Sequence, residues 1–313
     1  MAREDVKTQQ ENLSEIAAAF PEEIVHLENI TEKICLELAE AERSVEQMDE
    51  EYRETQLYMA EHRNEGDAKE MFQSEMALRQ IDSLGASAVV FRDKLRKTKA
   101  SPYFARIDFL PETGDEGALA YYIGLYAFRH ERQLLIIDWR SPVASMFYDF
   151  ELGHASYDAP RDHVEGELVL KRQFKIKNGE IEFAFDSSQN IQDDILQQEL
   201  AHTSDEKMKS IISTIQKEQN KIIRNEKAHT LIIQGVAGSG KTSIALHRVA
   251  FLLYRFRNTI KAQNVTILSP NKVFGDYISN VLPELGEEPI FEASLEDLAL
   301  VQMEEGVDFV GDR

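Results

Sequence analysis

Gly235-Val236-Ala237-Gly238-Ser239-Gly240-Lys241-Thr242 fits the pattern G-x-x-x-x-G-K-S/T of a phosphate-binding loop. The apolar run Thr230–Gln234 comes directly before the loop and predicts a strand, and Ile244–Tyr254 follows it and predicts a helix. This order matters because backbone N–H groups at a helix N-terminus must point at the phosphate, while glycines let the loop approach closely. The sequence therefore predicts that this segment binds a nucleotide. The alternative is a glycine-rich strand-to-helix turn with an incidental Lys-Thr pair.

Two residues of the loop are candidates for the chemistry. Lys241 is expected to contact the β- and γ-phosphates, and the Thr242 hydroxyl is expected to hold the Mg²⁺ that accompanies the nucleotide. We therefore predict ATP and Mg²⁺ as cofactors, with Lys241 and Thr242 as the catalytic candidates. The remaining candidate binding residues of the loop are Gly235, Val236, Ala237, Gly238, Ser239 and Gly240.

Composition narrows the class of protein. The chain has 313 residues, of which 42% are hydrophobic, enough for two or three globular domains. Its single cysteine, Cys35, excludes an intramolecular disulfide and suits a reducing compartment. No apolar run approaches the roughly 18 residues of a membrane helix, and no apolar segment typical of a signal peptide follows the N-terminal residues. We therefore expect a cytoplasmic protein that does not contact membranes.

The negative charge is concentrated near the N-terminus. Residues 1–66 contain 18 acidic and 6 basic residues, a balance of −12 out of a net charge of −21 for the chain. Such a segment would repel the phosphate backbone of nucleic acid. We expect it to face water or a basic protein surface.

A long heptad pattern lies in this acidic segment. Apolar and small residues recur in alternating steps of three and four, as in a coiled coil; they are Ile24, Leu27, Thr31, Ile34, Leu38, Ala41, Val45, Met48, Tyr52, Thr55 and Met59. We predict a helix at about 21–63, roughly 60 Å long, a turn at 64–67 and a second helix at about 68–97. The second helix is expected to place on one face Leu84, Ala88, Phe91 and Leu95. The pair would form an antiparallel hairpin, either for dimerisation or as an arm that contacts a partner.

The pattern changes to that of strands after Lys99. Ala120–Tyr126 and Gln133–Trp139 predict strands, and alternating apolar residues on both sides of Asn178-Gly179 predict a β-hairpin. Residues 101–186 are therefore expected to form a β-rich module.

The phosphate-binding loop is expected to lie in a parallel sheet. A helical stretch at about 191–225 leads to the loop, and Asn264–Ser269 predicts a second strand beyond it. Strand, loop, helix and strand make one βαβ unit with a right-handed crossover. A helix at about 272–281 would begin the next unit.

The loop region resembles motif I of superfamily 1 helicases of the UvrD/Rep type, because it continues into Leu246-His247-Arg248-Val249-Ala250. In that superfamily a glutamine upstream contacts the adenine, and Gln219 resembles it; a solvated helix residue is the alternative. A glutamine amide can both donate to N7 and accept from the N6 amino group. Ser269-Pro270-Asn271-Lys272 resembles motif Ia, so the resemblance implies nucleic-acid contacts for Ser269, Asn271 and Lys272.

The whole chain resembles the N-terminal portion of the HelD family of helicase-like ATPases. Besides the acidic hairpin, the similar blocks are Pro102–Phe109, Asp138–Pro142, Met146–Gly153, Phe185–Ser188 and Ile267–Gly286. The resemblance implies that the arm enters the secondary channel of bacterial RNA polymerase, and that ATP-driven motion of the motor domains releases stalled polymerase from nucleic acid.

Charged residues of the hairpin acquire candidate roles from this resemblance. The acidic residues near the turn are either a solvated tip or carboxylates that approach the polymerase Mg²⁺; they are Glu54, Glu61, Glu65 and Asp67. The basic residues near the end of the second helix either complement the helix dipole or contact nucleic acid or polymerase; they are Arg92, Lys94, Arg96, Lys97 and Lys99.

The sequence departs from the family in one respect. An ATPase of this superfamily needs a Walker B Asp-Glu and arginines that stabilise the transferring phosphoryl group. No apolar strand ending in Asp-Glu follows the loop, since Leu298–Glu305 is interrupted by Gln302 and lacks the Asp. We therefore expect a truncated chain that binds ATP weakly and does not hydrolyse it.

These observations predict a multidomain α/β protein. Its parts would be an acidic antiparallel coiled-coil arm at 1–99, a β-rich module at 100–190, and an incomplete helicase-type P-loop domain with a RecA-like parallel sheet at 191–313. Three functions stay open: an ATPase that recycles RNA polymerase, a non-catalytic nucleotide-binding interaction protein, and a UvrD/Rep-type DNA helicase that acts without polymerase.

Overall fold

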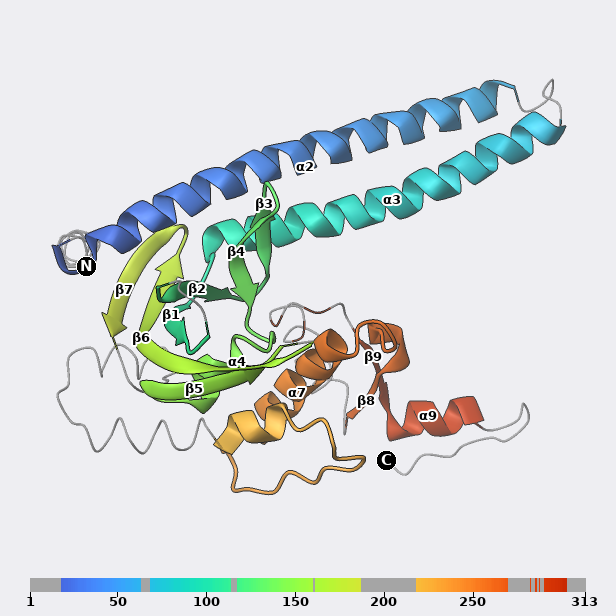
Figure 1. Ribbon diagram of the computed structural model, residues 1–313. Coiled ribbons are helices and arrows are strands. Elements are labelled where there is room, and N and C mark those ends of the chain that lie inside the picture. Colours follow the sequence, from blue (N-terminus) through green and yellow to red (C-terminus); the bar gives the residue numbers. More distant parts are fainter. Residues whose placement is uncertain are drawn as a thin grey trace, which may run out of the picture. The chain divides into compact units, whose positions relative to one another are not determined.

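The computed structural model describes residues 18–62, 68–113, 117–159, 161–186, 218–269, 282, 285, 287 and 290–302. These residues form helices, a mixed seven-stranded sheet and a small parallel sheet, so the chain is of the α/β class (Figure 1). They divide into two compact units, which we describe separately. The first contains residues 1–139, 152–154 and 165–188, and the second contains 140–151, 155–164 and 189–313. None of the described helices is long and apolar enough to cross a bilayer.

Two long helices dominate the first unit. Helix α2 spans Pro21–Glu61 and helix α3 spans Ala68–Ala100, and they lie side by side (Figure 1). Both helices predicted from the sequence are confirmed within three residues at each end. Pro21 occupies the first turn of α2, where its missing N–H has no helical partner to lose. The predicted turn at 64–67 lies outside the described residues.

The heptad pattern predicts the inner face of α2 correctly. Each residue of the heptad pattern, from Ile24 to Met59, is buried or half-buried. Five of these residues are less than a tenth exposed: Leu27, Ile34, Leu38, Ala41 and Val45. The whole heptad face of α2 is therefore at least partly covered by other residues of the same chain.

The inner face of α3 was predicted correctly at Ala88 and Leu95 and wrongly at Leu84 and Phe91. Leu84 and Phe91 are half exposed, whereas Leu95 is buried. The buried or half-buried positions at heptad spacing are Ser74, Leu78, Ile81, Gly85, Ala88, Arg92 and Leu95, and Val89, Lys94 and Thr98 are also buried or half-buried. Small residues on this face, such as Gly85 and Ala88, allow close helix packing even though larger apolar residues then stay outside.

The seven-stranded sheet has the order β3-β4-β2-β1-β6-β5, with β7 also paired to β6. Its strands are β1 Ala105–Pro111, β2 Leu119–Gly124, β3 Phe128–His130, β4 Gln133–Asp138, β5 Gly153–Asp158, β6 His163–Lys177 and β7 Glu180–Asp186. Strand β1 runs antiparallel to both β2 and β6, so that Ile107 lies opposite Tyr121 on one side and Lys171 on the other. The strands predicted at 120–126 and 133–139 are confirmed as β2 and β4.

The hairpin of β6 and β7 is also confirmed. Lys177 pairs with Glu180, which leaves Asn178 and Gly179 as a two-residue turn. Both turn residues have positive φ, 53° and 80°. This is the backbone of a type I′ turn, whose twist matches that of the flanking strands.

One apolar core joins the sheet to the proximal half of α2. Leu27, Ile30, Ile34 and Leu38 from the helix pack with sheet and connecting residues, including Tyr103, Tyr122, Phe128, Ile136, Phe174, Ile176 and Ile181. Full burial of one such aliphatic or aromatic side chain contributes about 1.5–3 kcal/mol. The base of α2 is therefore a structural layer of the first unit.

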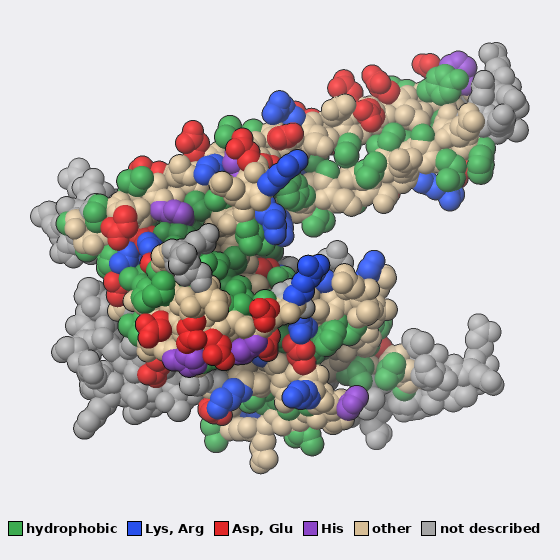
Figure 2. Space-filling view, viewed as in Figure 1, with side chains coloured by type: hydrophobic (Ala, Val, Ile, Leu, Met, Phe, Trp, Pro, Cys, Tyr) green, Lys and Arg blue, Asp and Glu red, His purple; other side chains and the backbone are tan. Residues whose placement is uncertain are grey.

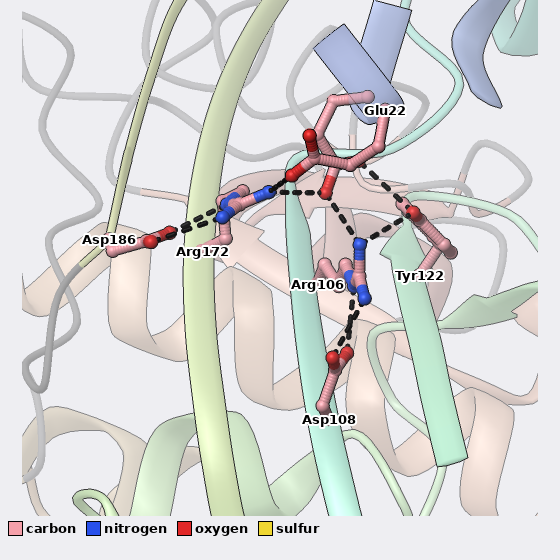
Figure 3. Close-up of polar contacts among 7 residues, drawn as sticks. Glu22, Arg106, Asp108, Tyr122, Arg172 and Asp186 are labelled. Carbon is pink, nitrogen blue, oxygen red and sulfur yellow. Dashed lines mark hydrogen bonds and ion pairs between the residues drawn. The ribbon is translucent and has the colours of Figure 1, made fainter. Parts of the chain in front are cut away.

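A buried ion network lies where α2 begins (Figure 3). Glu23 is fully buried and accepts hydrogen bonds from Arg106 Nη1 on β1 and Arg172 Nη1 on β6, both at 2.7 Å. The Tyr122 hydroxyl donates to the same carboxylate at 3.0 Å. Each arginine also binds a second carboxylate in a bidentate way, Arg106 that of Asp108 and Arg172 that of Asp186.

The network keeps its charges in spite of burial. Burial by itself lowers the pKa of Arg106, but the hydrogen bonds that it donates to Asp108 and Glu23 and the proximity of Tyr122 outweigh burial and raise that pKa overall. Arg172 has the same balance, with Asp186 as its largest favourable partner. The carboxylate of Glu23 thus lies between two guanidiniums that remain cationic.

His26 lies one turn further along α2 in an apolar setting. Its ring stacks on that of Tyr122, with 3.7 Å between the centroids, and its Nε2 atom has no hydrogen-bond partner among the described residues. Burial, with smaller contributions from the charges of Arg106 and Lys33, lowers the pKa of His26 from 6.5 to about 4.

The second unit contains the loop at 235–242 that the sequence predicts to bind phosphate. Residues 218–223 are helical, and the other elements are α4 Ser145–Asp149, α7 Lys241–Arg255, the 3₁₀ turn Ala262–Asn264, β8 Thr266–Ser269, β9 Phe291–Ser294 and α9 Leu295–Gln302. Strand β8 confirms the strand predicted at 264–269, and it pairs in parallel with β9. Most of the helix predicted at 191–225, and all of that predicted at 272–281, lie outside the described residues.

The strand predicted at 230–234 is wrong for the described chain. Residues 231–236 have no regular secondary structure, and Ile232 is 86% exposed. A strand needs a neighbour to accept its backbone hydrogen bonds, and the described part of β8 has β9 as its parallel partner instead. The predicted pairing of the loop strand with β8 is therefore not formed.

We predict that Glu23→Gln destabilises the first unit by about 3 kcal/mol, because two buried guanidiniums lose their shared counter-charge. The matched control is Glu22→Gln, since Glu22 is half exposed and binds only Arg172 of the two arginines; its effect should stay within about 1 kcal/mol. Urea unfolding followed by far-UV circular dichroism measures both. Equal effects of the two substitutions would show that the buried carboxylate has no special role.

We also predict a pH dependence from His26. The folded state keeps this ring neutral down to about pH 4, whereas an unfolded chain protonates it near its ordinary pKa of 6.5, so the unfolded state binds more protons between these values. The contribution is therefore complete above pH 6.5 and is lost as the pH falls towards 4. His26→Phe retains the ring stack and removes the titration, so wild type should lose stability relative to this variant across that window. Parallel stability curves would contradict the prediction.

Candidate nucleotide-binding site

The loop at 235–242 has the backbone of an anion-binding turn. Gly238 and Gly240 have φ of 78° and 79°, a region that side chains with a Cβ rarely adopt. At Gly235 a Cβ would lie 2.6 Å from Ser239 Oγ, so a larger residue there would require the Ser239 side chain to move. The Ser239 amide donates to the Val236 carbonyl at 3.3 Å and closes the turn.

Helix α7 begins where the loop ends. Gly240 is its N-cap, and the Ile244 amide donates to the Gly240 carbonyl at 2.8 Å. The first turn contains no acidic residue, so the positive end of the helix dipole is not neutralised there. The helix is held in place by a buried face of Ile244, Leu246, Ala250, Phe251 and Leu253.

The Lys241 ammonium lies over the loop. Its Nζ donates to the carbonyl oxygens of Gly235 at 3.0 Å and Val236 at 2.6 Å. Residues 235–238 are exposed, so solvent reaches the concave side of the turn. A phosphate that entered there would meet this cation together with the backbone amides at the start of α7.

Gln219 lies against the same loop. Its Nε2 atom is 3.7 Å from the point that a Cβ on Gly240 would occupy. The structure thus brings the predicted adenine-contacting residue beside the phosphate-binding turn, although 22 positions separate it from Lys241.

The helical segment 218–223 is anchored to α7. The Arg248 guanidinium donates to the carbonyl oxygens of Ile222 at 2.8 Å and Ile223 at 3.5 Å. Ile223 packs with Ile244 and Phe251 in a small apolar cluster. Burial lowers the pKa of Arg248, but a guanidinium stays protonated at physiological pH. Sequence reasoning gave Arg248 no such role.

These residues fit ATP with Mg²⁺. The loop geometry and Lys241 would suit a triphosphate, and Thr242, in the first turn of α7, is the residue whose hydroxyl would hold the metal. No cluster of three metal-binding side chains exists among the described residues.

The predicted motif Ia residues are not brought together in the described structure. Ser269 ends strand β8 and is 5% exposed, which leaves little of it accessible to nucleic acid. Asn271 and Lys272 lie outside the described residues.

Some of the charged candidate residues of the hairpin are likewise described by the structure, and others are not. Glu54 and Glu61 are exposed near the end of α2, whereas Glu65 and Asp67 lie outside the described residues. In the basic cluster of α3, Arg96 bridges to Glu42 of α2 at 2.7 Å and the Lys94 ammonium lies 5.0 Å from the centre of the Tyr126 ring. These two side chains therefore have structural contacts within the first unit.

Arg140, in the second unit, also has structural contacts. It is buried, forms an ion pair with Glu287, and places its guanidinium 4.7 Å from the centre of the Tyr254 ring on α7. From the sequence, the Trp139-Arg140 pair is expected to be a packing anchor rather than a site, and the burial of both residues agrees with that expectation.

Comparison with known protein families matches residues 20–222 to the family described as "DNA helicase IV HelD, N-terminal domain". That stretch covers well over half of the chain, including α2, α3, the seven-stranded sheet and Gln219. The chain belongs to the HelD N-terminal family. The resemblance noted from the sequence is thereby confirmed, and the protein is related to helicases. The match ends before the phosphate-binding loop begins. A search of curated proteins found no match.

We predict that Lys241→Ala lowers the affinity for tripolyphosphate at least tenfold, the size of one charge-assisted hydrogen bond. The fold should be unaffected, because the ammonium binds only exposed loop carbonyls. Lys227→Ala, which removes another exposed lysine of the second unit, is the matched control. Isothermal titration calorimetry measures the affinities. Phosphate release from ATP by wild type should not exceed that of Lys241→Ala, and faster release would refute the expectation of no turnover.

Proposed function

We propose that this chain is the nucleotide-binding N-terminal portion of a helicase-like ATPase that binds bacterial RNA polymerase and uses ATP to release it from nucleic acid. The observation that carries the proposal is the placement of Gln219 beside the phosphate-binding turn in a member of the HelD family. A glutamine that contacts adenine and a loop that contacts phosphate define a site for ATP, with Mg²⁺ held through Thr242 and the nucleotide.

The paired helices support an arm that contacts a partner rather than a dimerisation element. The heptad seam of α2 is covered within the chain, so it is not available to a second copy. The surface that remains outside is acidic along α2 and carries exposed apolar residues along α3 (Figure 2). The large exposed apolar residues of α3 are Phe72, Met76, Leu84, Val90 and Phe91. We propose that this antiparallel coiled-coil arm binds the polymerase.

The distal end of the arm would reach furthest into the partner. Exposed Glu54 and Glu61 are carboxylates of the kind that bind Mg²⁺, which supports an approach to the polymerase metal. Contacts with nucleic acid would come from the motor domain that follows in the family, since the arm itself has the wrong charge for them.

A non-catalytic nucleotide-binding interaction protein is the second candidate. In this case ATP would change the affinity for the partner without being consumed.

We predict that the distal arm is required for binding to polymerase. Deletion of all of 1–99 would remove half of the core, so the sharper variant replaces only 51–86 with a short glycine–serine linker and keeps Glu23, the core residues of α2, and the Glu42–Arg96 bridge. In a pull-down with purified core RNA polymerase, wild type should bind and this variant should not.

The matched control exchanges Glu54 and Glu61 for glutamine and retains the length of the arm. This variant separates two roles of the arm. If the carboxylates approach the polymerase metal, their loss should change transcription, while binding to polymerase through the rest of the arm should persist. Binding by the linker variant as strong as that of wild type would remove the arm from the proposed function.

A further inference from the structure

We infer that Asp149, at the end of α4, positions Gln219 for adenine recognition by holding the neighbouring residue Asn220. The inference rests on the proposed nucleotide-binding function and adds a specificity-determining contact to it. The Met146–Gly153 block that contains Asp149 has no other assigned role. All the contacts involved lie within the second unit.

The contact is a buried side-chain hydrogen bond. Asn220 is 5% exposed, and its Nδ2 donates to Asp149 Oδ1 at 2.7 Å. Its Oδ1 accepts from Arg224 Nε at 3.3 Å. Because a carboxylate only accepts and a guanidinium only donates, the amide of Asn220 is fixed in one orientation.

Helix α4 gives this bond a rigid base. Met146, Phe147 and Tyr148 are all buried, so the short helix has little freedom to move. The guanidinium of Arg224 also lies over the Tyr148 ring, 5.2 Å from its centre. Asp149 is therefore held in place by its neighbours before it reaches the helical segment 218–223.

That segment depends on outside contacts. Arg248 holds the carbonyl end at Ile222 and Ile223, which fixes the position of the segment along α7. The bond from Asn220 to Asp149 supplies a second point of attachment, and two points prevent rotation about the helix axis.

Rotation matters because of the residue next to Asn220. Gln219 lies against Gly240, and its amide must present both an acceptor and a donor to the edge of adenine. A small turn of the segment would misalign these two bonds, while the phosphate-binding loop would be unchanged. Asp149 is thus a positioning residue for base recognition and not for phosphate binding.

The test compares three probes on the full chain: ATP, ITP and tripolyphosphate. ITP carries a carbonyl in place of the N6 amino group, so the ratio of ATP to ITP affinity reports on base recognition alone. Tripolyphosphate reports on the loop alone. Calorimetric titration gives all three affinities.

Asn220→Asp places two carboxylates at hydrogen-bond distance, and we expect the preference for ATP over ITP to fall about tenfold, as for one lost hydrogen bond. Affinity for tripolyphosphate should not change. Adding Asp149→Asn exchanges donor and acceptor: the new amide donates to the new carboxylate, which still accepts from Arg224. This double variant should recover the preference.

Two control variants give the expected loss and the expected retention of the preference for ATP over ITP. Gln219→Ala should lose the preference as Asn220→Asp does. Asn225→Asp makes the same chemical change nearby but keeps the oxygen that accepts from the amides of Lys227 and Ala228, so it should behave as wild type.

Each outcome decides between the claims. An unchanged ratio in Asn220→Asp, or failure of the double variant to recover it, overturns the role of Asp149 and leaves the proposed function intact. If wild type binds tripolyphosphate but binds ATP no more tightly than ITP, the adenine role of Gln219 is overturned and this inference with it. Wild type that binds none of the probes overturns the nucleotide-binding function itself.

Discussion

The carboxylate of Glu23 receives three hydrogen bonds from groups on three different strands, and the first unit is organised around it. Arg106 of β1, Arg172 of β6 and Tyr122 of β2 all donate to it, in a place from which water is excluded. A buried carboxylate without these partners would oppose folding strongly. Because the partners come from neighbouring strands of one sheet, α2 can begin only where β1, β2 and β6 are already in register. The ion network therefore makes helix and sheet conditional on each other.

The site in the second unit is built by a comparable joining of distant segments. The loop at 235–242 and the start of α7 supply the phosphate-binding geometry, while Gln219 comes from the part of the chain that matches the HelD N-terminal family. Residues 140–151 also belong to this unit, although they follow directly on strand β4 of the first. The candidate site thus combines Gln219, which the family model matches, with residues that follow the matched stretch.

Local patterns in the sequence predicted local structure well. Pro21 and the heptad seam placed α2, Asn178-Gly179 placed the hairpin, and the glycine spacing placed the phosphate-binding turn. Strand β1 was missed although Ala105, Ile107 and Phe109 alternate with polar residues in the period of a strand. That signal was present and could have been used.

The misses depend on contacts between residues far apart in the chain. Glu23 and Arg106 are separated by 83 positions, and Asn220 and Asp149 by 71; no periodicity encodes either pair. On α3, Ala88 and Leu95 were placed correctly, but apolar size favoured Leu84 and Phe91, whereas the neighbouring Gly85 and Arg92 are the half-buried positions. The segment 230–234 has the composition of a strand, but its state depends on a neighbour that its own residues do not specify.

Amide hydrogen exchange of wild type and Glu23→Gln tests the mutual dependence of helix and sheet most directly. If the network joins them, the amides of Ile24–Val45 and those of β1 and β6 exchange in wild type with a common opening free energy. In Glu23→Gln both groups should lose protection by the same amount, while the amides of α7 keep theirs. Exchange of α2 in wild type at a much lower opening free energy than the sheet would show that the helix opens alone, and would contradict the account.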